Sequence, residues 1–360
     1  MNPVHLWRRA VALLAGLLAL TLVAGCGTSS TSDTTTAAGT GSAATTAPET
    51  RTVTDMADRE VTLPGEVTSI GTIGSVGVLN AFVQLMGGAD KIVNELPARF
   101  QSPQWAMQYE FSPQIKGGPL FEEADEIVIE NILTAKPDVI FTMTKDTASL
   151  LEERGIAVVY LEWKDTEDVK EAVTLVGEVL GEQELAAKYL TYFDATKDKA
   201  AALVADLPQD QRTTVLYGDP VGFSQPHVIA EWWIAQAGGV SVTAEASSGE
   251  SLKYTMEDLL AWNPQVMILT NAKLIDEIKA NSSYANITAV KDDNIHVIPT
   301  VAHVWGNRTV EQPLTVLWTL HQLYPDRLSA EDLGAEIKTF YKDFFGYEMS
   351  DEQVAKIIES

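Results

Sequence analysis

The sequence predicts an α/β protein with two lobes, each built on a mainly parallel sheet, joined by one long backbone helix. Three observations support this prediction. From Thr52 onward, short β-rich runs alternate with helical stretches, which is typical of parallel sheets covered by helices. A long amphipathic segment, residues 182–207, divides this alternation into two halves. The chain has 360 residues, which is enough for two ordinary hydrophobic cores.

The first lobe is expected over residues 51–181. Apolar runs rich in β-branched residues predict its strands, and apolar residues at helical spacing predict its helices. The predicted strands are Val67–Gly71, Val139–Thr144 and Ala157–Trp163. The predicted helices are Val76–Met86, Glu126–Ala135, Thr147–Arg154 and Thr166–Leu180.

Residues 182–207 are predicted to form the helix between the lobes. The apolar stripe at helical spacing consists of Leu185, Tyr189, Phe193, Ala200, Leu203, Val204 and Leu207. A helix of this length spans about 39 Å, and Pro208 marks its end. We expect a rigid strut, because bending a continuous helix breaks packing and hydrogen bonds, and therefore only modest closure of the lobes on binding.

The second lobe is expected over residues 208–360, where the alternation starts again. Its predicted strands are Thr213–Gly218, Val266–Thr270 and Asn294–Pro299. Its predicted helices are Val228–Ala237, Met256–Trp262 and Thr309–Tyr324.

The first 25 residues have the pattern of a signal peptide. Arg8 and Arg9 precede an uncharged stretch, Ala10–Gly25, which is shorter than the roughly 20 residues that a membrane-spanning helix needs. The end of this stretch together with the next residue, Val23–Cys26, resembles the bacterial lipobox, in which the cysteine is lipidated and becomes the mature N-terminus. An ordinary cleaved signal is the alternative. Cys26 is the only cysteine, so an internal disulfide, a cysteine-ligated zinc site and a catalytic thiol are excluded.

Residues 26–50 are predicted to be a flexible tether. From Gly27 to Thr50, 22 of 24 residues are Gly, Ala, Ser, Thr or Pro, which bury too little apolar surface to fold. Random-coil scaling would place a folded body roughly 25–30 Å from a bilayer. We therefore expect an extracytoplasmic protein that is held at the cell membrane by the lipid on Cys26 alone and does not span the membrane.

The net charge of −25 restricts the partners. A strongly acidic chain repels phosphate backbones and anionic lipid, so a nucleic-acid partner is not expected.

One motif occurs in both halves. "ENILTAKPDVIF" begins at Glu130, and "EDLLAWNPQVMI" begins at Glu257; in each, a Glu lies seven residues before a Pro that precedes an apolar strand. A carboxylate near a helix start is favoured by the helix dipole, so simple helix-start chemistry explains each Glu singly. The equal spacing indicates instead that the two acids occupy matching points on the two lobes.

These motifs together resemble a known family. "RTVTDMADREVTLP", "IENILTAKPDVIF", the long helix, "MEDLLAWNPQVMIL" and "WGNRTVEQPLTVLWTLHQLYPDRL" follow one another as in the substrate-binding proteins of ABC importers for iron-siderophores, haem and cobalamin. The resemblance implies two Rossmann-like lobes, a monomer without a resident cofactor, and a permease and ATPase complex as partner. It also implies that Glu130 and Glu257 dock onto arginines of the permease.

The same resemblance places a ligand in the cleft between the lobes, beside loops at the carboxyl ends of strands. Residues in such loops are the candidate ligand-binding residues: Trp105, Tyr109, Lys145, Trp163, Tyr217, His227, His303, Trp305 and Arg308. His303, Trp305 and Arg308 are the first choice, because they crowd one turn that has no core pattern. A packing role is the alternative for Trp105 and Trp163.

The expected ligand is an organic metal complex, with a ferric siderophore first and a corrinoid or haem next. Arg308 and Lys145 suit carboxylate or catecholate oxygens, and His227 or His303 could complete the coordination of a chelated metal. A directly bound metal is not expected, because too few ligands converge. Two other classes stay open: an extracytoplasmic hydrolase using Ser224 and His227 with a distant Asp, and a module that passes its ligand to a sensor.

Overall fold

The computed structural model describes residues 49–247 and 249–360. The predicted signal peptide, the lipidation site at Cys26 and the tether up to residue 48 lie outside the described residues. The strand β1 (Thr50–Thr54) opens the described part and pairs with β2 (Glu60–Pro64) as an antiparallel hairpin. Asp55 closes its turn, since its carboxylate accepts the backbone N–H groups of Ala57 and Arg59 at 2.9 and 3.1 Å.

The first lobe contains a three-stranded parallel sheet in the order β3-β6-β7. Every residue of these strands is buried, as expected for a parallel sheet covered on both faces. The strands are β3 (Ile70–Ile73), β6 (Val139–Thr142) and β7 (Val158–Tyr160). The helices are α1 (Val76–Leu85), α2 (Ala106–Phe111), α3 (Ile129–Ala135), α4 (Lys145–Glu152) and α5 (Thr166–Leu180).

The second lobe repeats this plan with a four-stranded parallel sheet in the order β10-β8-β12-β13. The strands are β8 (Thr214–Gly218), β10 (Val240–Ser241), β12 (Val266–Leu269) and β13 (Ile295–Val297). The helices are α7 (Ile229–Gln236), α8 (Met256–Trp262), α9 (Lys273–Ala280), α10 (Thr288–Lys291) and α11 (Gln312–Leu323). The predicted α/β class with parallel sheets is confirmed.

Two short antiparallel ribbons lie outside the main sheets. The first lobe has β4 (Glu122–Glu123) with β5 (Glu126–Ile127), and the second has β9 (Ser224–Gln225) with β11 (Leu252–Lys253). The β5 strand occupies the start of the helix predicted from Glu126, which shortens α3 to seven residues.

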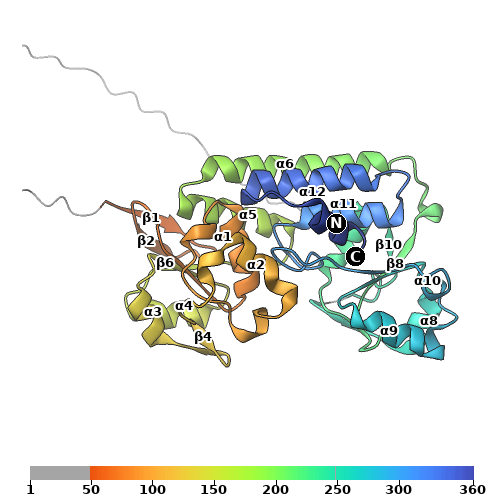
Figure 1. Cartoon of the computed structure of the whole chain (residues 1–360), viewed down its shortest axis with the longest axis horizontal. Helices are drawn as coiled ribbons and strands as arrows, with labels where there is room; N and C mark the ends of the chain where they lie inside the picture. The colour runs from red at the N-terminus through yellow and green to blue at the C-terminus, as the bar shows by residue number, and fades with distance from the viewer. Residues whose placement is uncertain (1–48, 248) are drawn as a thin grey trace, which may run out of the picture. The chain divides into compact units, whose positions relative to one another are not determined.

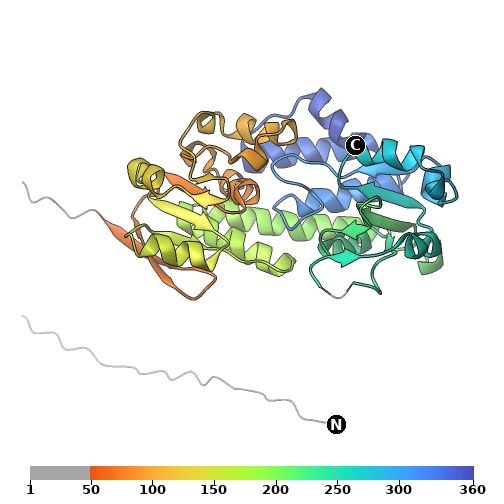
Figure 2. The ribbon, with the colours of Figure 1, turned by 90° about the horizontal axis from the view of Figure 1, so that it is seen from below.

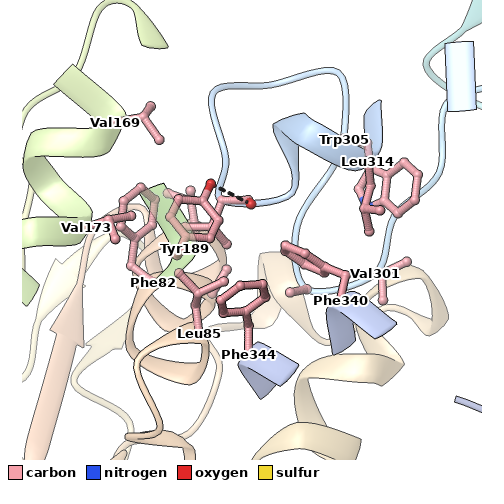
Figure 3. Packing of buried hydrophobic residues seen from close by; sticks show 14 of the residues in the cluster. Phe82, Leu85, Val169, Val173, Tyr189, Val301, Trp305, Leu314, Phe340 and Phe344 are labelled. Carbon is pink, nitrogen blue, oxygen red and sulfur yellow. Dashed lines mark hydrogen bonds between the residues drawn. The ribbon is translucent and has the colours of Figure 1, made fainter. Parts of the chain in front are cut away.

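The helix α6 (Gln183–Leu203) runs along both lobes (Figures 1 and 2). At 1.5 Å per residue its length is about 31 Å. Tyr189 is fully buried and packs against Phe344, with ring centroids 5.6 Å apart, and its hydroxyl donates to the Val310 carbonyl oxygen at 2.8 Å. Figure 3 shows Tyr189 in the core with Phe82 and Phe344. One continuous cluster of buried residues therefore joins both sheets through α6.

The C-terminal helices α12 (Ala330–Phe345) and α13 (Asp351–Ile358) were not among the predicted elements. Ser329 caps α12 by accepting the N–H of Asp332, and Gly346 ends it in a left-handed conformation. The helix lies alongside α6 and also contacts α1 of the first lobe, so the end of the chain covers both lobes (Figure 1). The lobe boundaries at 181/182 and 207/208 stay predictions.

Within residues 49–247 and 249–360, the structure has no helix with the length and apolar character that crossing a membrane requires.

Candidate ligand-binding site

A cavity of about 330 Å³ lies between the two lobes, at the carboxyl ends of the first lobe's strands. The first lobe contributes the turn after β3, the start of α1, the loop around residue 100, and the residues after β6 and β7. The second lobe contributes the segment before α7 and the loop before α11. The lining residues are Gly74, Ser75, Val78, Arg99, Phe100, Met143, Trp163, His227, His303, Asn307 and Arg308.

The first-lobe wall is braced by Arg99. Its guanidinium donates to the Gly74 carbonyl oxygen at 2.6 Å and forms an ion pair with Glu122 at 3.1 Å. Glu122 in turn accepts the N–H of Gly74 at 2.9 Å. Gly74 has φ of +89°, a conformation that glycine adopts without strain. This ring of contacts holds the turn that brings the positive end of the ten-residue helix α1 to the cavity.

The second-lobe wall is organised by Glu311, a fully buried carboxylate. Glu311 accepts the backbone N–H groups of Ala302 and His303 at 2.9 and 2.7 Å, and the indole N–H of Trp305 at 3.0 Å. Tyr341 of α12 donates its hydroxyl to the same carboxylate. Burial raises the pKa of Glu311. These bonds fold the loop before α11 so that His303, Asn307 and Arg308 line one side of the cavity.

The two histidines at the cavity are electrically neutral near pH 7. Burial, together with the nearby His227, lowers the pKa of His303 to about 3. Burial and the positive charge of Arg308 lower the pKa of His227, while Glu250 opposes this shift.

The His303 ring also has an unused donor. The amide nitrogen of Asn307 donates to His303 Nε2 at 3.3 Å, so in this orientation the neutral ring carries its proton on Nδ1. His303 Nδ1 is buried and has no hydrogen-bond partner among the described residues. Unsatisfied buried polar groups are rare, so this unpaired donor distinguishes the ring from an ordinary core histidine.

Arg308 connects the two lobes across the cleft. Its Nε donates to the carbonyl oxygen of Lys164 in the first lobe, and its Nη2 forms an ion pair with Glu250 at 2.9 Å. The side chain is only 10% exposed. These contacts do not use Nη1, which leaves part of the guanidinium fork available to an anion.

The lining of this cavity contains two arginines and two histidines and no carboxylate. Both guanidinium groups are already ion-paired behind the cavity wall, Arg99 with Glu122 and Arg308 with Glu250, so the lining itself offers N–H donors on charged groups, which suit anionic oxygens. No group of three or more His, Cys, Asp or Glu side chains with the geometry of a metal site is found in the described part of the chain.

Two other cavities have different chemistry. One of about 410 Å³ beside the β1–β2 turn has five carboxylates in its lining, from Asp55, Asp58, Glu162, Asp168 and Glu171. Another of about 420 Å³ lies between Gln104 and the C-terminal helix, and Lys356 is the only charged side chain of its lining. Neither has cationic side chains from both lobes in its lining.

Four of the nine candidate ligand-binding residues line the cavity, namely Trp163, His227, His303 and Arg308. Trp163 also has a packing role, because its ring stacks on Phe82 with centroids 4.5 Å apart.

The other five lie elsewhere. Trp305 and Tyr217 are fully buried core residues, and the Tyr217 ring packs edge-on against Trp233. Trp105 lies behind His303, with ring centroids 5.3 Å apart. Tyr109 donates to Glu95 at 2.7 Å, and Lys145 lies on the surface 4.0 Å from Glu162. Their roles as ligand contacts stay predictions.

The seven other lining residues were not among the nine candidates: Gly74, Ser75, Val78, Arg99, Phe100, Met143 and Asn307. Asn307 lies inside the cluster that was identified, directly before Arg308, so its position was a usable signal. Arg99 is the only arginine between Arg59 and Arg154, but its loop has no strand before it to indicate the cleft.

Glu130 and Glu257 occupy equivalent places in α3 and α8. Each is in the first turn of a seven-residue helix, and each is exposed. Neither carboxylate forms an ion pair with any residue that the structure describes.

Comparisons with known proteins agree with this architecture. Residues 100–302, more than half of the chain, match the family model described as "Periplasmic binding protein". The molybdate-binding protein MolA of Haemophilus influenzae is 22% identical over 322 residues, covering 82% of this chain and 91% of MolA.

Two solved structures share the fold. A periplasmic solute binding protein from Veillonella parvula has a TM-score of 0.73 and 24% identity, covering 86% of this chain and 97% of that one. Molybdate-bound MolA has a TM-score of 0.71 and 21% identity, covering 83% and 99%. Together with the matched family model, the two-lobed fold shows that this chain belongs to the periplasmic binding protein family, the extracytoplasmic solute-binding components that serve ABC transporters.

Proposed function

We propose that this protein captures a small oxyanion in the cavity between its lobes and delivers it to an ABC permease, and that molybdate is the first anion to test. The observation that carries the proposal is the convergence of Arg99, Arg308, His227 and His303 on one cavity without a lining carboxylate. Guanidinium groups form short, charge-assisted bonds to anionic oxygens, and neutral imidazoles add N–H donors. The relative MolA is a molybdate-binding protein by name, which supports this choice.

The size of the cavity also favours a small ligand. Its volume of about 330 Å³ is at the lower end of the range for ligand pockets, about 300–1,000 Å³. The Arg308 contact to Lys164 spans the cleft, so a larger guest requires that contact to break.

A compact anionic metal chelate is the second candidate. Phe100, Met143, Val78 and Trp163 give part of the lining an apolar and aromatic character that suits the organic rim of a ferric siderophore. A haem or corrinoid, which is bulkier, would need a wider opening of the lobes. This order reverses the first expectation from the sequence, where the organic metal complex came first.

We infer a monomer that is anchored by lipid on Cys26 and carries its ligand without a resident cofactor. The carboxylates of Glu130 and Glu257, which are exposed and form no ion pair within residues 49–247 and 249–360, would dock onto arginines of the permease.

Calorimetric titration of the full mature chain tests the ligand. Molybdate, tungstate and sulfate are compared with a ferric catecholate, haem and cobalamin. We expect saturable one-to-one molybdate binding that is weakened about 10- to 100-fold by Arg308→Gln, because hydrogen bonds to a charged group contribute about 1.5–3 kcal/mol. Arg154→Gln is the matched control, since Arg154 is exposed, lies outside the cavity lining, and donates to the Leu150 carbonyl oxygen of the preceding helix α4. Saturation by a chelate alone would favour the second candidate, and turnover of an excess ligand would point to an enzyme.

A further inference from the structure

The repeated motif has a second matched feature besides its acid. Leu133 is 47% exposed and Leu260 is 44% exposed, and these are the large hydrophobic side chains that stand exposed in the described part of the chain. Leu133 follows Glu130 by three residues, and Leu260 follows Glu257 by three. Side chains three apart on a helix are neighbours on one face. Each lobe therefore presents an acid beside an exposed leucine.

The local structures around the two leucines are equivalent. In each helix the residue before the leucine, Ile132 or Leu259, is fully buried and anchors the helix to its lobe. Each helix ends in a left-handed residue, Lys136 with φ of +50° and Asn263 with φ of +43°. A proline and then a fully buried strand follow in both cases. In both lobes the same framework thus directs one aliphatic side chain, Ile132 or Leu259, into the core and leaves the following leucine exposed to water.

The arrangement indicates a partner with two equivalent sites. In Figure 1, α3 and α8 lie at the ends of the two lobes away from α6, on the same side of the molecule. A second copy of this chain is a poor occupant, because the acids of α3 and α8 and a net charge of −25 would meet like charge. A partner with cationic side chains next to apolar pockets, repeated by a two-fold axis, has the required complementarity.

We propose that Leu133 and Leu260 are docking residues that insert into paired apolar pockets of the permease, each beside the cation that receives Glu130 or Glu257. The inference rests on the proposed function, since it assumes an ABC permease as the partner. Each leucine would thus add an apolar contact, whose strength does not fall with salt, to a carboxylate–cation contact that salt weakens. A leucine buried beside the carboxylate–cation pair would also exclude water from that pair.

Site-specific photo-crosslinking in membranes of the native host identifies the partner. Leu133→p-benzoylphenylalanine and Leu260→p-benzoylphenylalanine are each expressed in the full-length chain and irradiated, and the products are identified by mass spectrometry. Both positions should crosslink to the same multi-span permease polypeptide. The control, Thr191→p-benzoylphenylalanine, sits at an exposed position on α6 and should not crosslink to it. Crosslinks to lipid only, to different polypeptides, or to no permease would overturn the proposal.

Affinity measurements then separate the apolar contact from the carboxylate contact. The captured permease and ATPase complex is reconstituted in nanodiscs, and binding is measured for Leu133→Gln, Leu260→Gln and the double variant. Glutamine preserves helix propensity. Each single change should weaken docking about fivefold and the double change about 25-fold. The reason is that each substitution removes from the interface the apolar surface of roughly half a leucine side chain.

Two further comparisons keep the outcomes distinct. Thr191→Gln should leave docking unchanged, and all variants should keep the ligand affinity of the unmodified chain. Docking that is unaffected by the leucine changes but lost with Glu130→Gln and Glu257→Gln would overturn the apolar contact alone. Failure of molybdate and every chelate to bind would remove the proposed ligand without altering the crosslinking result.

Discussion

The buried His303 predicts a specific loss of stability in acid. The ring has a pKa of about 3 in the folded protein, compared with 6.5 as its ordinary value. Between these values the unfolded chain binds a proton that the folded chain does not, so folding stability falls as the pH decreases below about 6.5. From pH 7 to pH 4.5 protonation of this group in the unfolded chain lowers the free energy of unfolding by about 2.7 kcal/mol, about 1.36 kcal/mol for each of the two pH units between 6.5 and 4.5.

Denaturant unfolding of the wild type, His303→Asn and His303→Gln at both pH values measures this cost. The variants cannot take up the proton, so their unfolding free energy should fall by about 2.7 kcal/mol less than that of the wild type over the same interval. Carboxylates elsewhere titrate equally in all three proteins and cancel in the comparison. The His303 ring proton should also keep its neutral NMR shift down to pH 4.5. Equal acid losses in all three proteins would refute the reasoning, because they would mean that the ring is accessible to water.

Four further predictions follow from the same structure. Gly306→Ala should destabilise the protein by about 1–3 kcal/mol in thermal unfolding, because a Cβ there would lie 2.2 Å from the buried Tyr217 hydroxyl; an unchanged Tm would contradict this packing. Combined Glu130→Ala and Glu257→Ala should abolish uptake of labelled molybdate by cells and leave the affinity measured by calorimetry intact. Trp163→Phe should remove most of the ligand-induced fluorescence change, since Trp163 is the tryptophan that lines the cavity. The radius of gyration from X-ray scattering should be nearly the same with and without ligand, because one core runs through both lobes; a large contraction would count against a rigid strut.

Much of the fold was predictable because it depends on local patterns. The helices Thr166–Leu180 and Met256–Trp262 have the predicted bounds, and each has a side-chain N-cap, Asp165 or Thr255, directly before it. Strand ends were less accurate: β7 ends at Tyr160, three residues before the predicted end, because the chain leaves the sheet to form the cavity wall. The helices α12 and α13 were not predicted, although α12 supplies Phe344 and Tyr341 to the core and to Glu311.

The site was predictable only in part. The crowding of His303 and Arg308 after a strand was visible in the sequence, and both line the cavity. Trp305, in the same loop, has the same sequence signal but is fully buried, because its indole N–H bonds to Glu311. The direction of each side chain within a loop depends on the partners that the tertiary structure brings to it, and no local periodicity encodes those partners.

By itself, the sequence determined the alternation of strands and helices, the long joining helix and the duplicated acid motif, because each follows from propensity, periodicity or spacing along the chain. Only the tertiary structure decided that Arg99 and Arg308, from different lobes, line one cavity and that Leu133 and Leu260 are both left exposed. The physical reason is that burial, charge environment and direction are properties of contacts between segments far apart in the chain, and these exist only once the lobes have packed around their shared core.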